Sequence, residues 1–322
     1  MTPYPKPQLA YRQAHLLLSN LMRFIPLVPA ALVLLLTAAC SQAQSDKTTE
    51  PAAGAGADMP KGGDRRKDKN AAAEIAGLSK VGSIKGVVPE SSGLAPAPES
   101  GSYLSFGDDG NAPTLYEISG AGQLVRTLEV PATNTDWESL SRDGSGNYYI
   151  GDCGNNESLR RDLKIFKFRP DSPKAVGTIA FTYPDQREFP PKKKQRNFDC
   201  EASLWHEGQV WLFTKDRGQD RASNVYTVPD QPGTYTAKRV TSLAIPGQVT
   251  DAALRADGHR LVLLGRGELF ILDGNSWVEI LKATPRQISL AGAGQTEGAV
   301  FKDDNTLLIS TEKGDLYEYK LP

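Results

Sequence analysis

One pattern of polar and apolar positions returns five times between residues 80 and 322. Each copy has an acid, small residues, a hydrophobic position, a turn and a β-prone run, as in DWESL followed by NYYIGD. The repeated acids, which lie 48, 63, 50 and 46 residues apart, are Glu90, Glu138, Glu201, Asp251 and Glu297. Two further β-prone runs follow in each unit, with Gly, Pro, Asn and Asp between them. Four short strands at this period predict an all-β fold, a β-propeller of four-stranded blades.

The number of blades follows from the number of units. Five units predict five blades, and six remain possible if the 63-residue second unit hides a partial extra blade. The last unit is too short to supply a fourth strand. We expect residues 81–88 to supply it, so that an N-terminal strand joins the C-terminal blade, closes the ring and removes two open sheet edges.

The first 39 residues have the pattern of a bacterial signal peptide. They contain three bases and no acid, and their apolar run of 15 residues (25–39) is too short to span a bilayer. The run ends in TAAC, which resembles the lipobox of bacterial lipoproteins, although Thr37 stands where that motif prefers Leu. We therefore predict that Cys40 is lipidated. Ordinary cleavage after Ala39 would instead leave a soluble exported protein.

A flexible tether is predicted after the signal peptide. Residues 41–79 contain no aromatic residue, six bases and six acids, so they cannot bury enough apolar surface to order themselves. The predicted parts are a lipoprotein signal peptide (1–39), a lipid-anchored tether (40–79) and a propeller (80–322). Acyl chains on Cys40 would hold the protein on the cell membrane, or in a Gram-negative cell on the outer membrane, facing the periplasm or the surface. Met22, just before the apolar core, is an alternative start to Met1.

Composition and charge narrow the function. The chain has 322 residues, with 37 Lys and Arg against 38 Asp and Glu, a net charge of −1. This balance argues against a nucleic-acid partner, which favours a basic excess. Three cysteines exclude a disulfide-dense scaffold, and three histidines disfavour a zinc site built on several histidines. The sequence contains no G-x-S-x-G motif, P-loop or dinucleotide fingerprint.

The propeller topology is expected to bring the repeated acids together. The first strand of each blade lines the central channel, so the five acids would ring one of its mouths. Such a ring cannot stay fully ionised without a cation, a base or raised pKa values. Ca²⁺ prefers carboxylate and amide oxygens, so the candidate metal ligands are Glu90, Glu138, Glu201, Asp251 and Glu297. Alternatively, bases neutralise part of the ring, or the acids only tie neighbouring blades together.

Further side chains are candidates for the same mouth. The ends of the second strands would bring Lys215, Asp216 and Arg266 to it as ligand contacts. Trp137, next to Glu138, is a candidate ligand platform, although core packing is the usual role of such a residue. Asp152 and Glu138 are the candidate catalytic bases of a hydrolase.

Two cysteines remain after Cys40 in the chain. Cys153 ends a second strand and Cys200 begins the first strand of the next blade, so both are expected on one face of adjacent blades. Export places the protein in an oxidising compartment, which favours a Cys153–Cys200 disulfide. The alternative is a pair of buried free thiols.

The combination of ESSGL, DWESL, YYIGDCGNN, FTYPD, NFDCEASLW and VWLFTKDRG resembles a family of exported bacterial propeller proteins over residues 85–320. That family is similar to the phytase-like esterase and SdiA-regulated propeller groups, and the resemblance implies an exported, often lipid-anchored propeller. Its nearer enzyme relatives are calcium-dependent phosphatases and lactonases that work from an acidic channel mouth. The dense acidic motif of calcium-dependent phytases is not visible here.

Two functions therefore follow. The first is a membrane-anchored module of the cell envelope that binds a ligand or protein through its acidic channel mouth. The alternative is a Ca²⁺-dependent phosphoesterase or lactonase that uses the same acids, in which a held cation activates water. Cation affinity separates the two, because the hydrolase requires a metal and the binding module does not.

Overall fold

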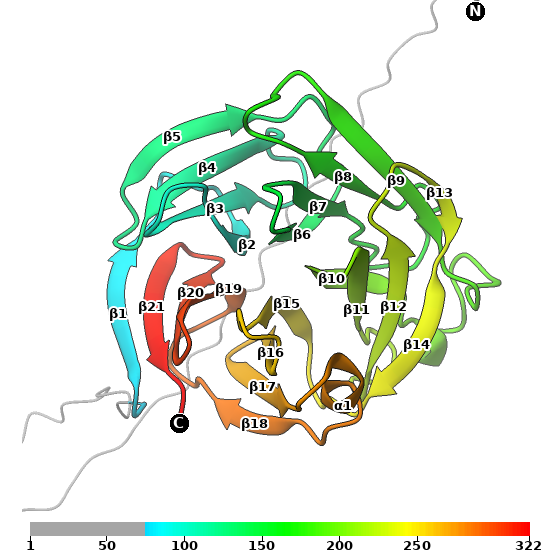
Figure 1. The fold of residues 1–322 in the computed structure, drawn as a ribbon. Coiled ribbons are helices and arrows are strands. Elements are labelled where there is room, and N and C mark those ends of the chain that lie inside the picture. Colours follow the sequence, from blue (N-terminus) through cyan, green and yellow to red (C-terminus); the bar gives the residue numbers. More distant parts are fainter. Residues whose placement is uncertain (1–74) are drawn as a thin grey trace, which may run out of the picture. The chain divides into compact units, whose positions relative to one another are not determined.

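The computed structural model describes residues 75–322, which form a ring of five sheets around a central channel (Figure 1). The predicted all-β propeller with five blades is confirmed. Helix is confined to a short α1 (Trp277–Ile280) and a 3-10 turn (Lys193–Gln195) in these residues. None of the helices described is long and apolar enough to cross a membrane. The predicted signal peptide, Cys40 and most of the tether lie outside the described residues.

The blades follow the sequence units in order, with each first strand at the channel. Blade 1 consists of β2 (Ser91–Pro96), β3 (Ser102–Gly107), β4 (Thr114–Ser119) and β5 (Leu124–Glu129). Blade 2 consists of β6 (Trp137–Arg142), β7 (Tyr148–Asp152), β8 (Lys164–Phe168) and β9 (Val176–Thr182). Blade 3 consists of β10 (Asp199–His206), β11 (Gln209–Lys215), β12 (Ser223–Pro229) and β14 (Lys238–Leu243). Blade 4 consists of β15 (Val249–Leu254), β16 (Arg260–Gly265), β17 (Glu268–Asp273) and β18 (Arg286–Ser289).

Blade 5 closes the ring as predicted. It consists of β19 (Thr296–Asp303), β20 (Thr306–Thr311), β21 (Asp315–Lys320) and the N-terminal β1 (Leu78–Ser83). Leu78 pairs with Tyr319 and Ser83 with Asp315, in antiparallel register. The strand begins three residues before the expected position 81. It ends at Ser83 because the chain then turns and buries Ile84 in the core.

The long second unit does not hide an extra blade. Its additional length is the connection between β9 and β10, which includes the 3-10 turn. A further strand, β13 (Gly233–Thr236), comes from the third unit and pairs in parallel with β9 on the outer edge of blade 2. The chain of blade 3 thus covers an edge of its neighbour, which removes a row of unpaired backbone groups.

The core lies between adjacent blades, where the apolar faces of two sheets meet. Trp137 of β6 shows the arrangement, since it is fully buried between Phe106 of blade 1 and Phe166 of blade 2, with ring centroids 6.0 and 6.3 Å away. Its indole Nε1 donates to the Thr133 carbonyl oxygen at 2.9 Å. Packing of this kind holds each first strand in place, and with it the side chains that face the channel.

Candidate functional site

A bulge near the start of each first strand decides which side chain reaches the channel mouth. In blade 2 the register with β7 shifts between Trp137 and Ser139, so that Glu138 is the extra residue. The corresponding bulge residues of blades 3, 4 and 5 are Glu201, Thr250 and Glu297. In blade 1 the shift lies between Ser91 and Leu94 and includes Ser92. Three of the five bulges therefore carry a glutamate.

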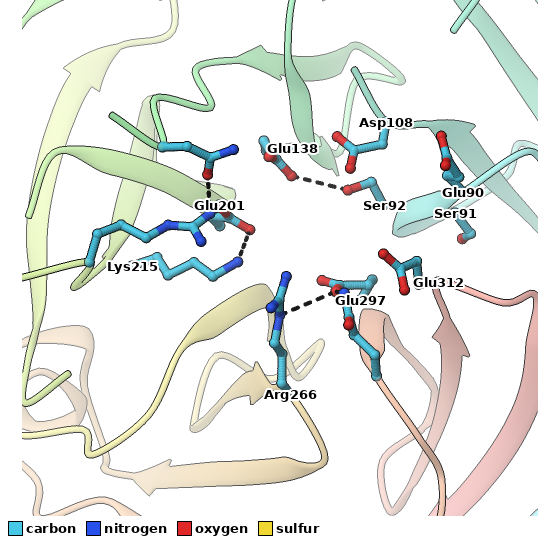
Figure 2. A pocket seen from close by; sticks show the side chains of 13 residues that line it. Glu90, Ser91, Ser92, Asp108, Glu138, Glu201, Lys215, Arg266, Glu297 and Glu312 are labelled. Carbon is cyan, nitrogen blue, oxygen red and sulfur yellow. Dashed lines mark hydrogen bonds and ion pairs between the residues drawn. The ribbon is translucent and has the colours of Figure 1, made fainter. Parts of the chain in front are cut away.

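The channel mouth holds a cavity of about 120 Å³ (Figure 2). Its acidic lining residues are Glu90, Asp108, Glu138, Glu201, Glu297 and Glu312. Its basic lining residues are Lys215, Arg217 and Arg266. Figure 2 shows Lys215 beside Glu201 and Arg266 beside Glu297. These bases face Asp108, Glu90 and Glu312 across the cavity.

The acids of blade 3 have ion-pair partners within their own blade, although burial and the charge of Glu201 still raise the pKa of Asp199 to about 8. Lys215 Nζ lies 2.7 Å from Glu201 Oε2, and Arg217 Nη2 lies 2.7 Å from Glu201 Oε1. Arg217 Nε also lies 2.5 Å from Asp199 Oδ2. Burial acts to raise the pKa of Glu201, but the two cations outweigh it and the pKa is lowered. Glu201 is therefore an ionised carboxylate that is already paired.

The acids of blade 2 have the same spacing but no such partners. Asp136 and Glu138 correspond to Asp199 and Glu201, because Trp137 pairs with Asp152 as Cys200 pairs with Thr214. The positions of Lys215 and Arg217 are consequently taken in blade 2 by Cys153 and Asn155, which carry no charge. A base approaches this pair only at Asp136, where Arg160 Nη1 lies 4.0 Å from Oδ2, and Glu138 has no ion-pair partner among residues 75–322.

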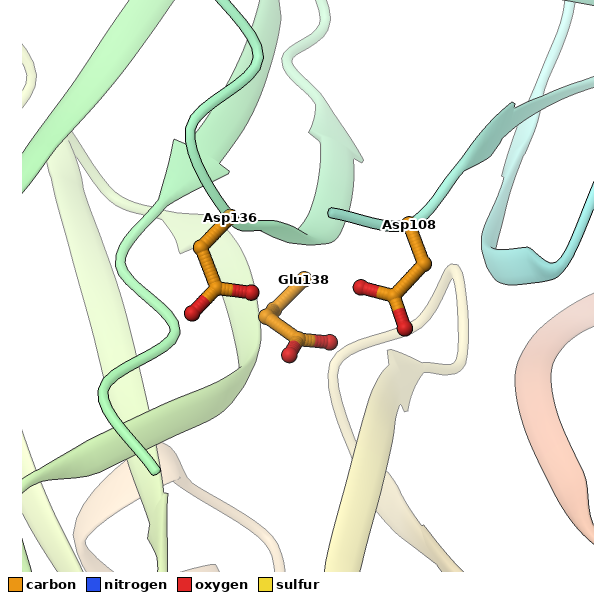
Figure 3. Close-up of side chains that lie close together, drawn as sticks. All are labelled: Asp108, Asp136 and Glu138. Carbon is orange, nitrogen blue, oxygen red and sulfur yellow. The ribbon is translucent and has the colours of Figure 1, made fainter. Parts of the chain in front are cut away.

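A compact group of three carboxylates results. Asp108, at the end of β3, joins Asp136 and Glu138, and one oxygen from each lies within 4.8 Å of the others (Figure 3). Ser92 donates to Glu138 Oε2 at 3.1 Å. Burial, and then the negative charge of Asp108, raises the pKa of Asp136 to about 7. Burial and the neighbouring acids also raise the pKa of Glu138 well above its usual value. The three carboxylates repel one another when ionised, so either protons or a bound cation would stabilise the group.

The local chain around this group is built to hold Asp136. The Asp136 N–H donates to Asp152 Oδ1 at 3.1 Å, and Arg160 Nη2 holds the same oxygen at 2.9 Å. Gly154 packs directly against the Asp136 carboxylate, where a β-carbon would collide with it. The GDCG segment thus provides both a hydrogen-bond acceptor and the space for the acid.

Glu297 faces the basic side of the cavity. Burial is the main reason that its pKa is raised to about 7, and the charge of Lys215 opposes the rise. Gln295 Nε2 donates to Glu297 Oε1 at 2.6 Å, and Arg266 Nε lies 3.7 Å from the same oxygen. The Arg266 side chain is 42% exposed, so it is the cation of the cavity most open to solvent.

Several predicted site residues do line the cavity. Of the proposed metal ligands and ligand contacts, these are Glu90, Glu138, Glu201, Glu297, Lys215 and Arg266. Asp251 does not. It is fully buried below the mouth, where its carboxylate accepts the Ala252 and Ala299 N–H groups at 2.8 Å each. Because the bulge residue of blade 4 is Thr250, the repeat pattern placed the acid one position away from the channel-facing site.

Two predicted ligand contacts have structural roles instead. Trp137 lies in the core between blades and does not reach the cavity, so it is no ligand platform. Asp216 is nearly buried, and its carboxylate accepts the N–H groups of Gly218, Gln219 and Arg221 at 3.0 to 3.1 Å. These hydrogen bonds stabilise the turn that carries Arg217, and they occupy the carboxylate that was expected to contact a ligand.

The predicted base Asp152 and the predicted disulfide also require correction. Asp152 is fully buried, bound by Arg160, and does not line the cavity. Cys153 and Cys200 are free and buried, and the Cys153 thiol donates to the Cys200 carbonyl oxygen at 3.3 Å. The topology does place the two cysteines side by side, as expected, but as thiols within the interblade core.

The site residues that were not assigned from the sequence include Ser92, Asp136, Arg217 and Gln295. A signal existed for two of them. The D-x-E spacing occurs twice, at Asp136 and at Asp199, and only the second copy is followed by a K-D-R segment. The other two, Ser92 and Gln295, depend on the exact bulge and loop positions, which the sequence pattern does not determine.

Comparisons with known proteins show a likeness in fold alone. No protein family model matches the chain, and no curated protein matches it. Virginiamycin B lyase from Staphylococcus aureus, solved with quinupristin, is similar over 72% of this chain at 12% identity and a TM-score of 0.39, and the match spans 66% of the lyase chain. The PQQ-bound aldose sugar dehydrogenase from Streptomyces coelicolor is similar over 76% of this chain and 97% of its own, at 11% identity and a TM-score of 0.45.

Proposed function

We propose that the protein binds a divalent cation of the Ca²⁺ type at its channel mouth and serves as a membrane-anchored binding module of the cell envelope. The observation that carries this proposal is the difference between two copies of one motif. Asp199 and Glu201 are paired with Lys215 and Arg217, whereas Asp136 and Glu138 have uncharged residues at those positions. Glu138 is buried without an ion-pair partner among residues 75–322, and the half-buried Asp136 has Arg160 only at 4.0 Å, so a cation that replaces their protons would be stabilised.

The dimensions of the site suit such an ion. Ca²⁺ binds oxygen ligands at about 2.3–2.6 Å, so two ligands on opposite sides lie about 5 Å apart. The oxygens of Asp108, Asp136 and Glu138 fall within 4.8 Å of one another, so one ion could contact all three. The cavity of about 120 Å³ has room for the ion and a few waters, since water occupies about 30 Å³ in the liquid. A ligand larger than this would bind across the mouth.

Hydrolysis of a phosphoester or lactone is the second candidate function. It is favoured by Arg266, which is partly exposed across the cavity from Asp108 and Glu138. A cation held by the acids would activate water, while Arg266 would bind the anionic group of the substrate. Of the two predicted bases, Glu138 lines the cavity and Asp152 does not.

Anchoring remains part of the proposal. Lipidation of Cys40 and a flexible tether over residues 40–79 would hold the propeller near a membrane and leave its channel mouth free to meet a partner. The support for this comes from the sequence pattern of residues 1–40 alone.

Calorimetric titration of Ca²⁺ into the purified full chain tests the cation site. We expect micromolar binding that Asp136→Asn and Glu138→Gln each weaken at least tenfold. Glu312→Gln is the matched control, because Glu312 lines the cavity outside the three-carboxylate group, and it should change the affinity less than threefold. Failure to bind millimolar Ca²⁺, or equal binding by all variants, would refute the site. Turnover of phosphoesters or lactones only with Ca²⁺ would favour the hydrolase.

A further inference from the structure

The opposite mouth of the channel contains a larger hollow. It has a volume of about 620 Å³, against about 120 Å³ at the acidic mouth. All five blades line it with the carboxyl-terminal parts of their first strands, including Pro96, Leu140, Leu204, Leu254 and Phe301. We refer to it as the lower funnel. Its volume falls in the range of about 300–1,000 Å³ that is typical of sites for small molecules.

The wall of the lower funnel is largely apolar. The residues that line it include leucines from three blades, Val300 and Phe301, and Trp205 adds an aromatic surface. The indole Nε1 of Trp205 is already bound, since it donates to Asp230 Oδ2 at 2.8 Å. Such a wall favours an apolar molecule that leaves water.

Most charges around the lower funnel are satisfied within the protein. Arg255 and Asp257 form a two-point ion pair, with Nε and Nη2 at 2.9 and 2.8 Å from the carboxylate. The Asp143 carboxylate accepts four hydrogen bonds, from Ser145, Asn147 and Tyr149. Neither acid is available to a ligand without loss of these bonds.

Arg142 is the exception. No carboxylate of residues 75–322 lies within 4.0 Å of its guanidinium group, which rests 5.7 Å from the Tyr148 ring centroid and donates through Nη1 to the Ala97 carbonyl oxygen at 3.1 Å. Arg142 lines the lower funnel and is half-buried. An anionic group in the funnel would therefore pair with a charge that has no carboxylate partner among these residues.

We propose that the lower funnel binds a small amphipathic carboxylate, with its apolar body against the apolar lining and Trp205 and its carboxylate on Arg142. A cation would meet the unpaired charge of Arg142, and a neutral apolar molecule would leave it unpaired. The volume of the hollow and its single unpaired charge fit one small anion rather than a protein surface.

This site is independent of the cation site. The residues that line the two hollows are entirely different. Between the hollows, neighbouring blades are tied by the Ser139–Ser203 hydroxyl pair at 2.7 Å, the Ser91–Ser310 pair at 3.1 Å and the bond from Ala299 N–H to Asp251. Failure of either proposal leaves the other standing.

Titration of decanoate into the full chain, followed by calorimetry and by Trp fluorescence, tests the proposal. Decanol supplies the apolar body without the charge, and acetate supplies the charge without the body. We expect decanoate to bind at least tenfold more tightly than either. Arg142→Gln should weaken decanoate at least tenfold and leave decanol within threefold. Detergent that keeps the full chain in solution also takes up decanoate, but this partition is the same for all variants and cancels in the comparison.

Two further variants keep the test decisive if Arg142→Gln alters the fold. Ala256→Phe adds bulk at an exposed position of the lower funnel and should abolish binding without loss of thermal stability. Arg169→Gln removes an exposed arginine of the adjacent hollow, already paired with Asp171, and should change nothing. Absence of decanoate binding, equal binding of decanol, or binding that survives Ala256→Phe would overturn the proposal. If the N-terminal segment of the chain occupied the lower funnel, decanoate would not bind, and this result would also overturn the proposal.

Discussion

Lys215 Nζ lies 2.7 Å from Glu201 Oε2, and the two side chains are only 1% and 3% exposed. Lys215 is one of the three bases that line the channel mouth, and it is already paired. Blade 2 repeats the acids of blade 3 but has Cys153 and Asn155 where blade 3 has Lys215 and Arg217. These two positions distinguish Glu201, which has two ion-pair partners, from Glu138, which has none among residues 75–322.

Lys215→Met should destabilise the protein strongly. It leaves Glu201 buried with only Arg217 as a partner, and removal of one member of a buried pair typically costs about 3 kcal/mol or more. Denaturant unfolding monitored by circular dichroism measures the loss. The double variant Lys215→Met with Glu201→Leu should recover at least half of it. A single-variant loss below about 1 kcal/mol would show that Arg217 alone satisfies the glutamate.

Asp251→Ala should reduce stability without affecting Ca²⁺. The change leaves the buried N–H groups of Ala252 and Ala299 without their acceptor, at a cost of about 2 kcal/mol or more. Thermal unfolding gives the loss, and calorimetry should find the Ca²⁺ affinity unchanged. Loss of Ca²⁺ binding in a folded Asp251→Ala variant would instead make this residue a ligand, as the repeat pattern suggested.

The sequence predicted the fold better than the site. Blade number, strand order and the closing N-terminal strand follow from period and alternation, which are properties of many residues at once. The channel-facing position depends on a single bulge. Blade 4 has Thr250 at its bulge and Asp251 beside it, so a shift of one residue placed the predicted acid in a buried position outside the cavity. In blade 1 the bulge includes Ser92, and Glu90 before it also lines the cavity.

The pairing of charges was also beyond the sequence. Lys215 and Arg266 were expected at the mouth, but the ion pair between Lys215 and Glu201 follows only from the register of β11 against β10. Asp136 was visible as part of a D-x-E motif. Its role became clear from Gly154 and Asp152, which approach it from the next strand. The partner of each charged side chain depends on contacts between strands, which a repeat pattern along the sequence does not reveal.

Removal of the N-terminal strand should open the ring. A chain that starts at residue 84 lacks β1, so β21 loses its only outer partner and exposes unpaired backbone groups. We expect aggregation or loss of the cooperative thermal transition, whereas a chain that starts at residue 75 should unfold like the full chain. A peptide of residues 75–83 added in trans should partly restore the transition. Cooperative unfolding of the shorter chain at an unchanged temperature would contradict the closure.

Gly154→Ala should weaken Ca²⁺ binding in a folded protein. The added β-carbon would meet the Asp136 carboxylate, which must then move away from Asp108 and Glu138. Calorimetry should show at least a tenfold loss of affinity, because ligand oxygens tolerate little displacement from an ion. Gly144→Ala, at a position with open space around it, is the matched control. Equal affinities in the two variants would mean that Asp136 does not bind the ion.

Stability should fall with rising pH when Ca²⁺ is absent and recover when it is present. Folding raises the pKa of Asp136 from 3.8 to about 7 and that of Glu297 from 4.5 to about 7, chiefly through burial. Between these values the folded chain holds protons that the unfolded chain has released, so the free energy of unfolding decreases as pH rises from about 4 to about 7. Ca²⁺ binds the ionised form, so it should raise the melting temperature more at about pH 8 than at about pH 5. In Asp136→Asn, the loss of stability with pH should be smaller and most of the Ca²⁺ effect should vanish, as measured by thermal unfolding with EDTA and with millimolar Ca²⁺. A Ca²⁺ effect of equal size at both pH values would show that the ion does not compete with these protons.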